Sequence, residues 1–384
     1  MKRNCKVLIF HPTIAPYRIS FFNKLYKSFH TRICLYYKNL EDNKFDYEKI
    51  EEQFVFKPTY FDRKRKIAGR DFYIGHMKKI AEYQPDVVIV GEYGEALWAS
   101  VIYRFFHRRK YKILSICDDS RKIAEDCGGL RKLSRDLLLK QIDGLILCNE
   151  DVQSWYSSNK NYNSTYVFPI IQDESEFDSN YEEKCALARK IISDNELVGK
   201  RVFLFVGRLA PEKNIEYLID SFIAQHEKHP ENILYIIGGE SLKAPQFRSE
   251  MQGKIECNNA QSYIVFAGRY EGTELMAWYL AGQALVLPSY YEPFGAVVNE
   301  ALLSGEYVMV SDRAGASCLV NDGNGEIIDI SKPLIDFENA CSRIKPVGTD
   351  WNPSMSRMPY SFSDKMNGLL EWLDSIIDGK NTKS

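Results

Sequence analysis

The stretch that decides the fold is Ser289-Tyr290-Tyr291-Glu292-Pro293-Phe294-Gly295-Ala296-Val297-Val298-Asn299-Glu300-Ala301. An apolar run at residues 284–287 comes just before it and is typical of a buried parallel strand. A loop with Glu292 follows, and we expect a helix to begin after Gly295 and to carry Glu300. A glycine beside a helix N-terminus leaves backbone N–H groups and the positive end of the helix dipole accessible, which suits phosphate. The two carboxylates would hold sugar hydroxyls on either side of it; the alternative interpretation is a strand-loop-helix unit with surface glutamates.

Apolar runs of strand length recur along the whole chain, separated by helical patterns. They lie at residues 6–10, 33–37, 54–57, 87–90, 113–117, 145–148 and 166–168, and then at 202–206, 233–237, 263–267, 284–287, 307–310 and 326–328. Such alternation gives parallel sheets with helices on both faces and ligands at the carboxyl ends of the strands. The strands are too many for one sheet. We therefore expect an α/β protein of two doubly wound, Rossmann-like domains.

The boundary between these domains is expected at residues 169–180, where Pro169 precedes a polar, acidic run. We assign residues 1–172 to the first domain, 173–359 to the second and 360–384 to a terminal segment. That segment has apolar residues at helical spacing from Met366 to Ile376, so it predicts an amphipathic helix that needs a docking surface.

Composition excludes several classes of protein. The chain has 384 residues, of which 45% are hydrophobic and 27% charged, as in ordinary globular proteins. Its nine cysteines show no CxxC or metal-ligand spacing, which favours reduced thiols in a cytosol. No apolar run approaches the ~18 residues that a membrane span needs. These features predict a cytoplasmic protein.

Charge is unevenly distributed along the chain. Residues 1–150 hold 29 Lys and Arg against 19 Asp and Glu, whereas residues 151–384 hold 21 against 33. The basic first half predicts contact with something anionic. Two stretches combine basic and aromatic residues: 61–67, expected to be a loop, and 104–110, at the end of a helical pattern. They favour a peripheral contact with the inner face of a membrane, with a solvated basic face as the alternative. No nucleic-acid-binding module is present, so nucleic acid is not an expected partner.

Two further loops follow strands of the second half. The run at 202–206 leads into Gly207, with Arg208 and Lys213 in the same strand-to-helix loop. Two cations fixed there would neutralise a diphosphate, unless they are ordinary surface cations on a turn. The strand at 263–267 ends in Gly268-Arg269-Tyr270, a suitable place for a base or a ribose.

Together, the loops of residues 201–322 resemble those of the retaining glycosyltransferases of the GT-B fold, in particular glycosyltransferase family 4 (group 1). The resemblance is carried by four motifs: Phe205-Val206-Gly207-Arg208-Leu209 with Lys213-Asn214; Phe266-Ala267-Gly268-Arg269-Tyr270; Pro288-Ser289; and the pair Glu292/Glu300 around Glu-Pro-Phe-Gly. It implies two Rossmann-like domains facing a central cleft, with a terminal helix crossing back to the N-terminal domain. The first domain would bind the acceptor and the second the nucleotide sugar.

The resemblance also implies roles for individual residues. Arg208 and Lys213 would grip the donor's diphosphate, Gly295 and Ala296 would offer it backbone N–H groups, Glu300 would hold the ribose and Glu292 the transferred sugar. The catalytic set is thus Glu292, Arg208 and Lys213. The other donor-binding residues are Gly207, Gly268, Arg269, Tyr270, Phe294, Gly295, Ala296 and Glu300.

The sequence departs from the family pattern at two turns. Ile237-Gly238-Gly239-Glu240-Ser241 stands where many members have a Gly-x-Gly-Pro type turn. Residues 11–18, which begin His11-Pro12, replace the glycine-rich turn often found after the first strand and are similar to those of some polysaccharide-building members. The acceptor side is therefore read from the residues alone. Its candidates at expected strand ends are His11, Glu92, Asp118 and Asp119, with helix caps and turn acids as the alternative for each.

The chemistry expected is sugar transfer without a metal or another cofactor. Metal-dependent enzymes of this kind usually carry an Asp-x-Asp motif, and the sequence has none; fixed cations would stabilise the leaving diphosphate instead. The resemblance implies a retaining hexosyltransferase that moves sugar from a nucleotide-diphosphate sugar to a glycan or lipid-linked saccharide, in bacterial surface polysaccharide synthesis. The alternatives are a sugar-nucleotide epimerase of similar fold and a non-catalytic binding subunit.

Overall fold

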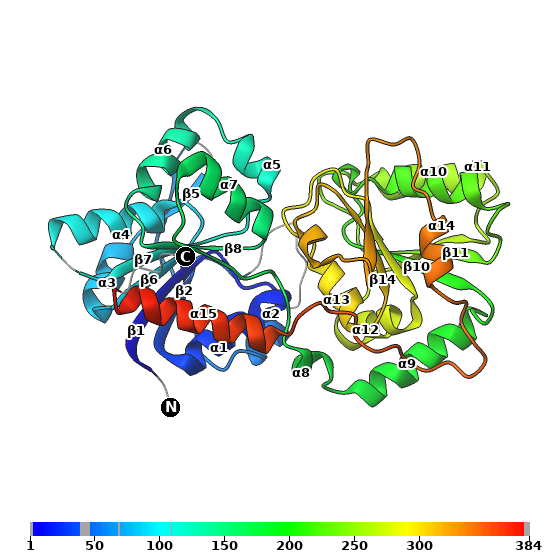
Figure 1. The fold of residues 1–384 in the computed structure, drawn as a ribbon, viewed down its shortest axis with the longest axis horizontal. Coiled ribbons are helices and arrows are strands. Elements are labelled where there is room, and N and C mark those ends of the chain that lie inside the picture. The colour runs from blue at the N-terminus through cyan, green and yellow to red at the C-terminus, as the bar shows by residue number, and fades with distance from the viewer. Residues whose placement is uncertain (1–2, 39–46, 68–69, 109, 380–384) are drawn as a thin grey trace. The chain divides into compact units, whose positions relative to one another are not determined.

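The computed structural model describes residues 3–38, 47–67, 70–108 and 110–379. By its internal contacts the chain divides into two compact units, Met1–Gln172 with Phe362–Ser384, and Asp173–Ser361 (Figure 1). We call them the first and the second unit.

The first unit is built on a seven-stranded parallel sheet in the order β3-β2-β1-β6-β7-β8-β9. Its central strands are buried on both faces, which explains their continuous apolar runs. They are β1 (Arg3–His11), β2 (Phe29–Leu35), β3 (Thr59–Tyr60), β6 (Val87–Gly91), β7 (Lys112–Cys117), β8 (Gly144–Leu147) and β9 (Thr165–Val167).

Helices connect these strands and cover the sheet (Figure 1). They are the 3₁₀ turn η1 (Pro16–Arg18), then α1 (Ile19–Ser28), α2 (Tyr47–Glu52), α3 (His76–Tyr83), α4 (Glu95–Phe106), α5 (Arg121–Glu125), α6 (Gly129–Leu139) and α7 (Glu150–Lys160). On one face, α4 packs between α3 and α6.

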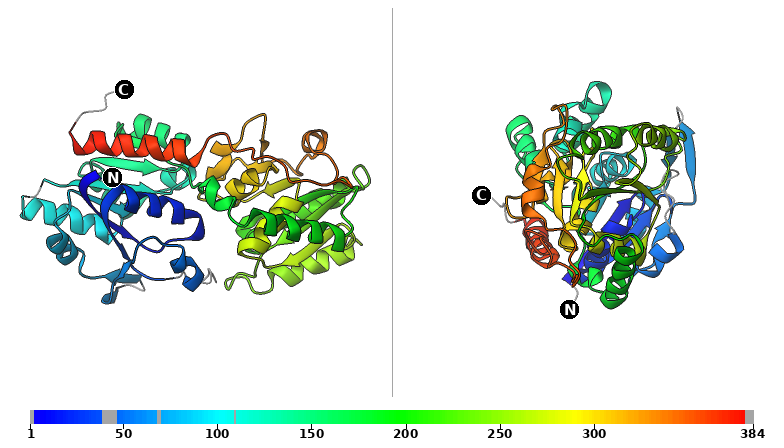
Figure 2. Two further views of the ribbon diagram at one scale, coloured as in Figure 1. Left: turned by 90° about the horizontal axis from the view of Figure 1, so that it is seen from below. Right: turned by 90° about the vertical axis from the view of Figure 1, so that its right-hand side faces the viewer.

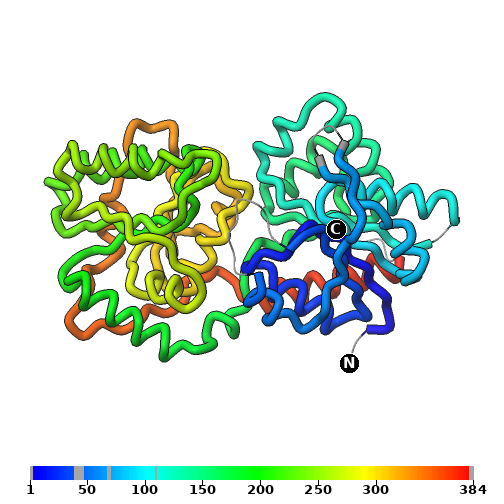
Figure 3. The backbone as a smooth tube through the Cα atoms, turned by 180° about the vertical axis from the view of Figure 1, so that it is seen from behind, coloured from blue at the N-terminus to red at the C-terminus, as the bar shows by residue number. Residues whose placement is uncertain are grey.

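The terminal helix α15 (Phe362–Ile377) completes the first unit, as the red segment of Figures 2 and 3 shows. Its apolar stripe is buried, and the rings of Phe362 and Phe168 lie 5.7 Å apart. The indole of Trp372 occupies the space that a Cβ on Gly144 would need, at 2.8 Å. The predicted return of the last helix to the first Rossmann-like unit is therefore confirmed.

The second unit contains a six-stranded parallel sheet in the order β12-β11-β10-β13-β14-β15. Its strands are β10 (Arg201–Val206), β11 (Asn232–Ile237), β12 (Ile264–Gly268), β13 (Ala284–Leu287), β14 (Tyr307–Ser311) and β15 (Gly325–Ile328). Its helices are α8 (Glu174–Phe177), α9 (Tyr181–Asp194), η2 (Pro211–Lys213), α10 (Ile215–Gln225), α11 (Phe247–Cys257), α12 (Gly272–Ala281), α13 (Val297–Leu303), η3 (Gly315–Leu319) and α14 (Glu338–Arg343).

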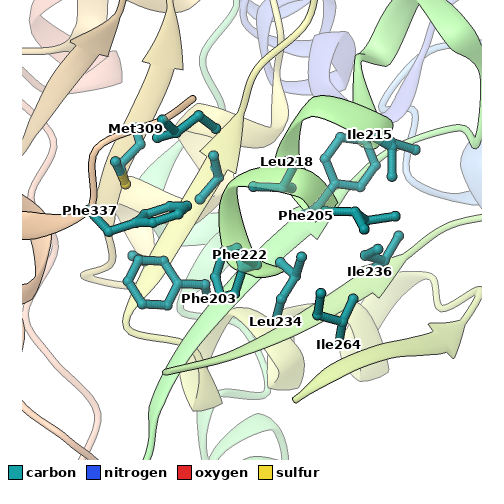
Figure 4. Packing of buried hydrophobic residues seen from close by; sticks show 14 of the residues in the cluster. Phe203, Phe205, Ile215, Leu218, Phe222, Leu234, Ile236, Ile264, Met309 and Phe337 are labelled. Carbon is teal, nitrogen blue, oxygen red and sulfur yellow. The ribbon is translucent and has the colours of Figure 1, made fainter. Parts of the chain in front are cut away.

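The core of the second unit lies between the sheet and α10 (Figure 4). Phe203 and Phe205 point from β10 toward Leu218 and Phe222 of α10, and the ring of Phe337 packs 4.7 Å from that of Phe222. Burying side chains of this size contributes roughly 1.5–3 kcal/mol each, which fixes the strand ends that carry the site loops.

Two details of the prediction are wrong. Residues 54–57 are not a strand: Phe54 and Phe56 stack at 5.0 Å in an irregular segment, and β3 begins only after Pro58, which has no N–H to donate to a sheet. The basic run expected in a loop instead forms β4 (Lys64–Ile67), paired antiparallel with β5 (Arg70–Tyr73).

Among the described helices, none is long and apolar enough to cross a membrane.

Candidate active site

The loops singled out in the second unit meet where its strand order reverses. β10 and β13 are neighbours there. The chain continues from β10 to β11 toward one edge of the sheet and from β13 to β14 toward the other edge. In open α/β sheets this switch point is where loops separate and a ligand can enter. The loop after β10 carries Arg208 and Lys213, and the loop after β13 carries Glu292.

The ammonium group of Lys213 and the carboxylate of Glu292 form an ion pair at this point. Both side chains are largely buried, with 13% and 12% of their areas exposed. Two hydrogen bonds join the same loops: the Asn214 side-chain amide donates to the Pro288 carbonyl at 3.1 Å, and the Tyr290 N–H donates to the Glu212 carbonyl at 2.9 Å. The pair is thus held by ordered backbone on both sides.

Arg208 lies on the same loop and is more exposed than Lys213. Its guanidinium is 3.6 Å from the carboxylate of Glu212, one turn along the chain. More than a third of each side chain is exposed, so this contact is weak and leaves the guanidinium able to exchange partners.

The loop after β13 then turns sharply into α13. Gly295 has φ of 103°, and a Cβ there would lie 2.7 Å from Leu287, so a glycine is required. Phe294, predicted to bind the donor, has a buried side chain, and its carbonyl accepts from the Ala316 N–H at 2.8 Å. Ala296 stands at the start of α13, where the first backbone N–H groups of a helix have no acceptor in a preceding helical turn.

Glu300 projects from the first turn of α13 and is held by a buried tyrosine. The Tyr279 hydroxyl, inaccessible to solvent, donates to Glu300 Oε2 at 2.9 Å. Burial and the negative charge of Glu300 raise the pKa of Tyr279 well above its ordinary value, so this hydroxyl stays a donor. Tyr279 fixes the Glu300 carboxylate, a role that the sequence does not predict because the pattern of α12 is that of an ordinary buried helix.

Backbone contacts join the loops after β10, β11 and β12. The Gly207 N–H donates to Ile237, the Leu209 N–H to Gly239 and the Gly238 N–H to Gly268. A Cβ on Gly238 would lie 1.7 Å from the Gly207 carbonyl oxygen, so this approach excludes any side chain there. The glycine at position 238 is therefore a packing requirement of this loop cluster.

Two predicted donor residues follow Gly268. The Arg269 guanidinium donates to Glu271 and lies against Gly239. The Tyr270 ring is 5.7 Å from that of Trp278, which also packs on Tyr235. The cluster thus presents an arginine and an aromatic ring beside the glycine turns.

In the first unit, the structure brings the four acceptor candidates to one edge. The strand order reverses between β1 and β6, and His11, Glu92, Asp118 and Asp119 lie at the carboxyl ends of β1, β6 and β7, which are neighbours. Cβ of a residue replacing Gly91 would meet the His11 ring at 3.0 Å, so the ring packs directly beside the strand that leads to Glu92.

Two buried arginines, absent from the predicted site, organise these acids. Arg18 forms an ion pair with Asp118. Arg135 lies 2.6 Å from Asp119 and 3.8 Å from Glu92, with its guanidinium over the Tyr93 ring at 4.8 Å. Arg18 belongs to the His11–Arg18 stretch that the sequence analysis marked as unusual, whereas Arg135 lies in an amphipathic helix where nothing distinguishes it from a surface cation.

The local environment shifts two pKa values in this cluster. Partial burial, with 44% of the side chain exposed, and the negative charges of Asp119 and Asp118 raise the pKa of Glu92 to about 7. Burial lowers the pKa of His11 to about 4, so the ring is neutral near pH 7 and donates from Nδ1 to the Thr13 carbonyl at 2.6 Å. Glu92 is therefore the group in this edge that can gain or lose a proton near neutral pH.

No group of three or more His, Cys, Asp or Glu with metal-binding geometry occurs within the part of the chain that the structure describes. Whether transfer depends on a metal stays a prediction from the sequence.

Residues 189–336 match the family model described as glycosyl transferases group 1. Over 143 residues the chain is 36% identical to a Methanocaldococcus jannaschii protein called uncharacterized glycosyltransferase MJ1607, covering 36% of this chain and 34% of that protein. Over 118 residues it is 31% identical to mannosylfructose-phosphate synthase of Agrobacterium fabrum, covering 30% of this chain and 26% of that protein. The matches thus span about a third or less of these relatives.

Solved structures resemble nearly the whole chain. Alr3699/HepE of Anabaena in complex with UDP matches 97% of this chain and 92% of its own, with a TM-score of 0.66 and 16% identity. The same protein in complex with UDP-glucose gives a TM-score of 0.61. The likeness shows a common fold of both units.

Proposed function

We propose that the chain transfers a hexosyl group from a nucleotide-diphosphate sugar to a saccharide acceptor, because it has the GT-B fold and its residues 189–336 match the model of the group 1 glycosyl transferases. The observation that carries the proposal is the buried Lys213–Glu292 pair at the switch point of the second unit. A cation and a carboxylate fixed at that point match the two ends of a sugar–diphosphate bond.

Donor binding would exchange the partners of this pair. The diphosphate oxygens take Lys213 and Arg208, and the backbone N–H groups at Gly295 and Ala296 face the same charge. Glu292, released from Lys213, accepts hydrogen bonds from hydroxyls of the transferred sugar, while Glu300 accepts those of the ribose. Arg269 and Tyr270 bind the nucleoside side of the donor.

Charge development explains how these groups would accelerate transfer. As the sugar–phosphate bond breaks, positive charge grows on the anomeric carbon and negative charge on the departing diphosphate. Cations already in place stabilise that negative charge without reorganising solvent. We propose that this suffices without a metal and that transfer proceeds with retention, the donor phosphate helping to take the acceptor proton.

The acceptor is proposed to be a glycan or lipid-linked saccharide in surface polysaccharide synthesis. Supporting this are the His11–Arg18 stretch, similar to that of some polysaccharide-building members, and the acid cluster at the switch point of the first unit. Glu92 is the proposed group that orients the acceptor hydroxyl, because its carboxylate changes charge near neutral pH.

A donor screen tests the proposal directly. The purified chain is mixed with UDP-, GDP- and dTDP-sugars, and the melting temperature is measured, since a ligand that binds the native state raises it. One class of nucleotide sugar should stabilise wild type but not Lys213→Ala. A flat response to every nucleotide sugar and free nucleotide diphosphate would argue against a donor site.

Product analysis separates the proposed transferase from its alternatives. The stabilising donor is incubated with and without saccharide acceptors, and products are analysed by mass spectrometry and NMR. Acceptor-dependent release of nucleotide diphosphate, with an unchanged anomeric configuration in the product, supports retaining transfer. Formation of epimerised donor in the absence of acceptor would favour the epimerase. Donor binding without turnover on any acceptor would favour a non-catalytic subunit.

A further inference from the structure

Helices α4 and α6 of the first unit lie side by side and run in the same direction. The Trp98 indole on α4 donates to the Ser134 hydroxyl on α6 at 3.1 Å. Six residues further on, the Arg104 guanidinium donates to the Gln141 carbonyl just past α6 and to Asp143 at 2.8 Å. The contacts of Trp98 with Ser134 and of Arg104 with Gln141 place the outer faces of the two helices next to each other.

These outer faces are apolar. Seven large hydrophobic side chains on the two helices are exposed, and we call them together the α4–α6 face: Trp98, Ile102, Phe105, Phe106, Leu130, Leu133 and Leu137. Phe105 is 77% and Leu130 is 85% exposed. Their spacing forms one stripe on each helix, opposite the side that already packs on the sheet.

A helix that covers a sheet normally turns polar residues outward. Here α4 buries Ala96, Leu97 and Tyr103 on its inner side and still exposes a second apolar stripe. Contiguous exposed apolar surface of this kind marks a binding surface.

Basic residues border this face at both ends. Residues 104–112 contain five Lys and Arg and no Asp or Glu, and residues 129–140 contain four against one Asp. Arg108 and Lys110 follow α4, Arg131 and Lys132 lie near the start of α6, and Lys140 follows its end; all are exposed. Across the described parts of the chain none of these five forms an ion pair. Arg109, part of the predicted basic stretch, lies outside the described residues.

We propose that the α4–α6 face docks on an anionic lipid bilayer, with the apolar side chains entering the interface and the basic border contacting lipid headgroups. Trp and Phe beside Arg and Lys are the composition of helices that lie in a membrane interface. A second copy of the chain fits less well, because a two-fold contact would place the same basic border against itself. This surface is separate from the donor site, so the proposal stands or fails independently of the proposed function.

Vesicle binding tests the proposal. The full chain is sedimented with vesicles of equal parts phosphatidylglycerol and phosphatidylcholine, and with phosphatidylcholine alone. We expect binding to the anionic vesicles that weakens with salt. Phe105→Ser/Phe106→Ser should reduce partitioning at least about tenfold, because two large apolar side chains no longer leave water. Vesicles of brominated lipid should quench Trp fluorescence in wild type and clearly less in Trp98→Phe.

Matched variants locate the surface. Leu242→Ser/Met355→Ser removes exposed apolar side chains of the second unit and should leave vesicle binding unchanged. Lys332→Glu/Lys345→Glu reverses two exposed charges of the second unit and should also leave binding unchanged, whereas Arg108→Glu/Lys110→Glu should weaken it. Wild-type binding by the Phe105/Phe106 variant with a normal melting temperature would overturn the proposal. Loss of binding only when the charges of Arg63 and Arg65 are reversed would also overturn it. The same holds if the chain binds no vesicles and instead forms a dimer that Phe105→Ser abolishes.

Discussion

Lys213 and Glu292 form an ion pair in the second unit although 79 positions separate them in sequence. Each lies on a different loop, and the loops diverge from neighbouring strands β10 and β13. The family resemblance implies different tasks for the two residues, phosphate binding for Lys213 and sugar binding for Glu292. In the structure each charge compensates the other, which offsets part of the cost of burying two charges.

Replacing either member should therefore impair transfer. Lys213→Ala removes a cation from the leaving diphosphate, and Glu292→Ala removes the carboxylate that would hold hydroxyls of the transferred sugar. We expect kcat/KM for the donor to fall by about 10²–10³ in each case, the usual cost of losing one preorganised electrostatic group. The double variant should fall by less than the product of the two single effects, because the residues act as a unit.

An exposed Lys–Glu pair of the same unit provides the control. Lys228 pairs with Glu338 on the surface, with 66% and 52% of the side chains exposed. Lys228→Ala should leave both turnover and melting temperature near those of wild type. Near-wild-type turnover in both Lys213→Ala and Glu292→Ala would refute the site assignment.

Gly238 should be intolerant of any side chain. A Cβ there would collide with the Gly207 carbonyl oxygen at 1.7 Å, so Gly238→Ala must displace the loop that carries Arg208 and Lys213. We expect donor-induced thermal stabilisation to be lost in this variant. Gly253→Ala is the matched control: it lies in α11 with open space around the added methyl and should stabilise the chain by roughly 0.5–1 kcal/mol. Normal donor binding by Gly238→Ala would show that the loops tolerate separation.

The sequence predicts the second unit well because its site is built from local units. Gly207 follows β10, Gly268 ends β12 and Gly295 lies just before α13. An apolar run followed by glycine therefore locates the sheet edge at β10 and β12 before any tertiary contact is known. The match over residues 189–336 confirms the family resemblance drawn from these loops. What the sequence does not show is the pairing of Lys213 with Glu292 or the support of Glu300 by Tyr279, since both depend on packing between distant segments.

The first unit is harder to predict for a related reason. His11, Glu92, Asp118 and Asp119 lie at the strand ends where the sequence predicts them, but Arg135 comes from the middle of α6, where only burial distinguishes it. The strand expected at 54–57 fails because an alternating aromatic pattern is equally compatible with Phe54 stacking on Phe56 before Pro58.

Glu92 should give the reaction a pH dependence. Its pKa is raised to about 7, so the carboxyl is neutral in more acidic solution and ionised above that pH. If the ionised form orients the acceptor hydroxyl, kcat/KM for the acceptor should rise with pH and level off above about 7. Glu92→Gln should lower the plateau and abolish this limb, whereas Glu125→Gln, on the exposed surface near Arg121, should keep it. A limb that persists in Glu92→Gln would assign it to another group.

Glu306 should make the second unit less stable as pH rises. Its carboxyl is fully buried, neither oxygen has a hydrogen-bond partner among the described residues, and burial raises its pKa well above 4.5. The unfolded chain loses this proton above pH 4.5 while the folded chain keeps it. The folded state then binds more protons, and its free energy of unfolding falls by up to about 1.4 kcal/mol per pH unit until the folded group also ionises. Glu306→Gln removes this proton linkage, so the difference in stability between variant and wild type should grow in the variant's favour as the pH rises above 4.5. Urea unfolding at a series of pH values measures it, with Glu256→Gln on the exposed side of α11 as the control expected to follow wild type. Parallel stability curves for wild type and Glu306→Gln would mean that this carboxyl is ionised in the folded protein.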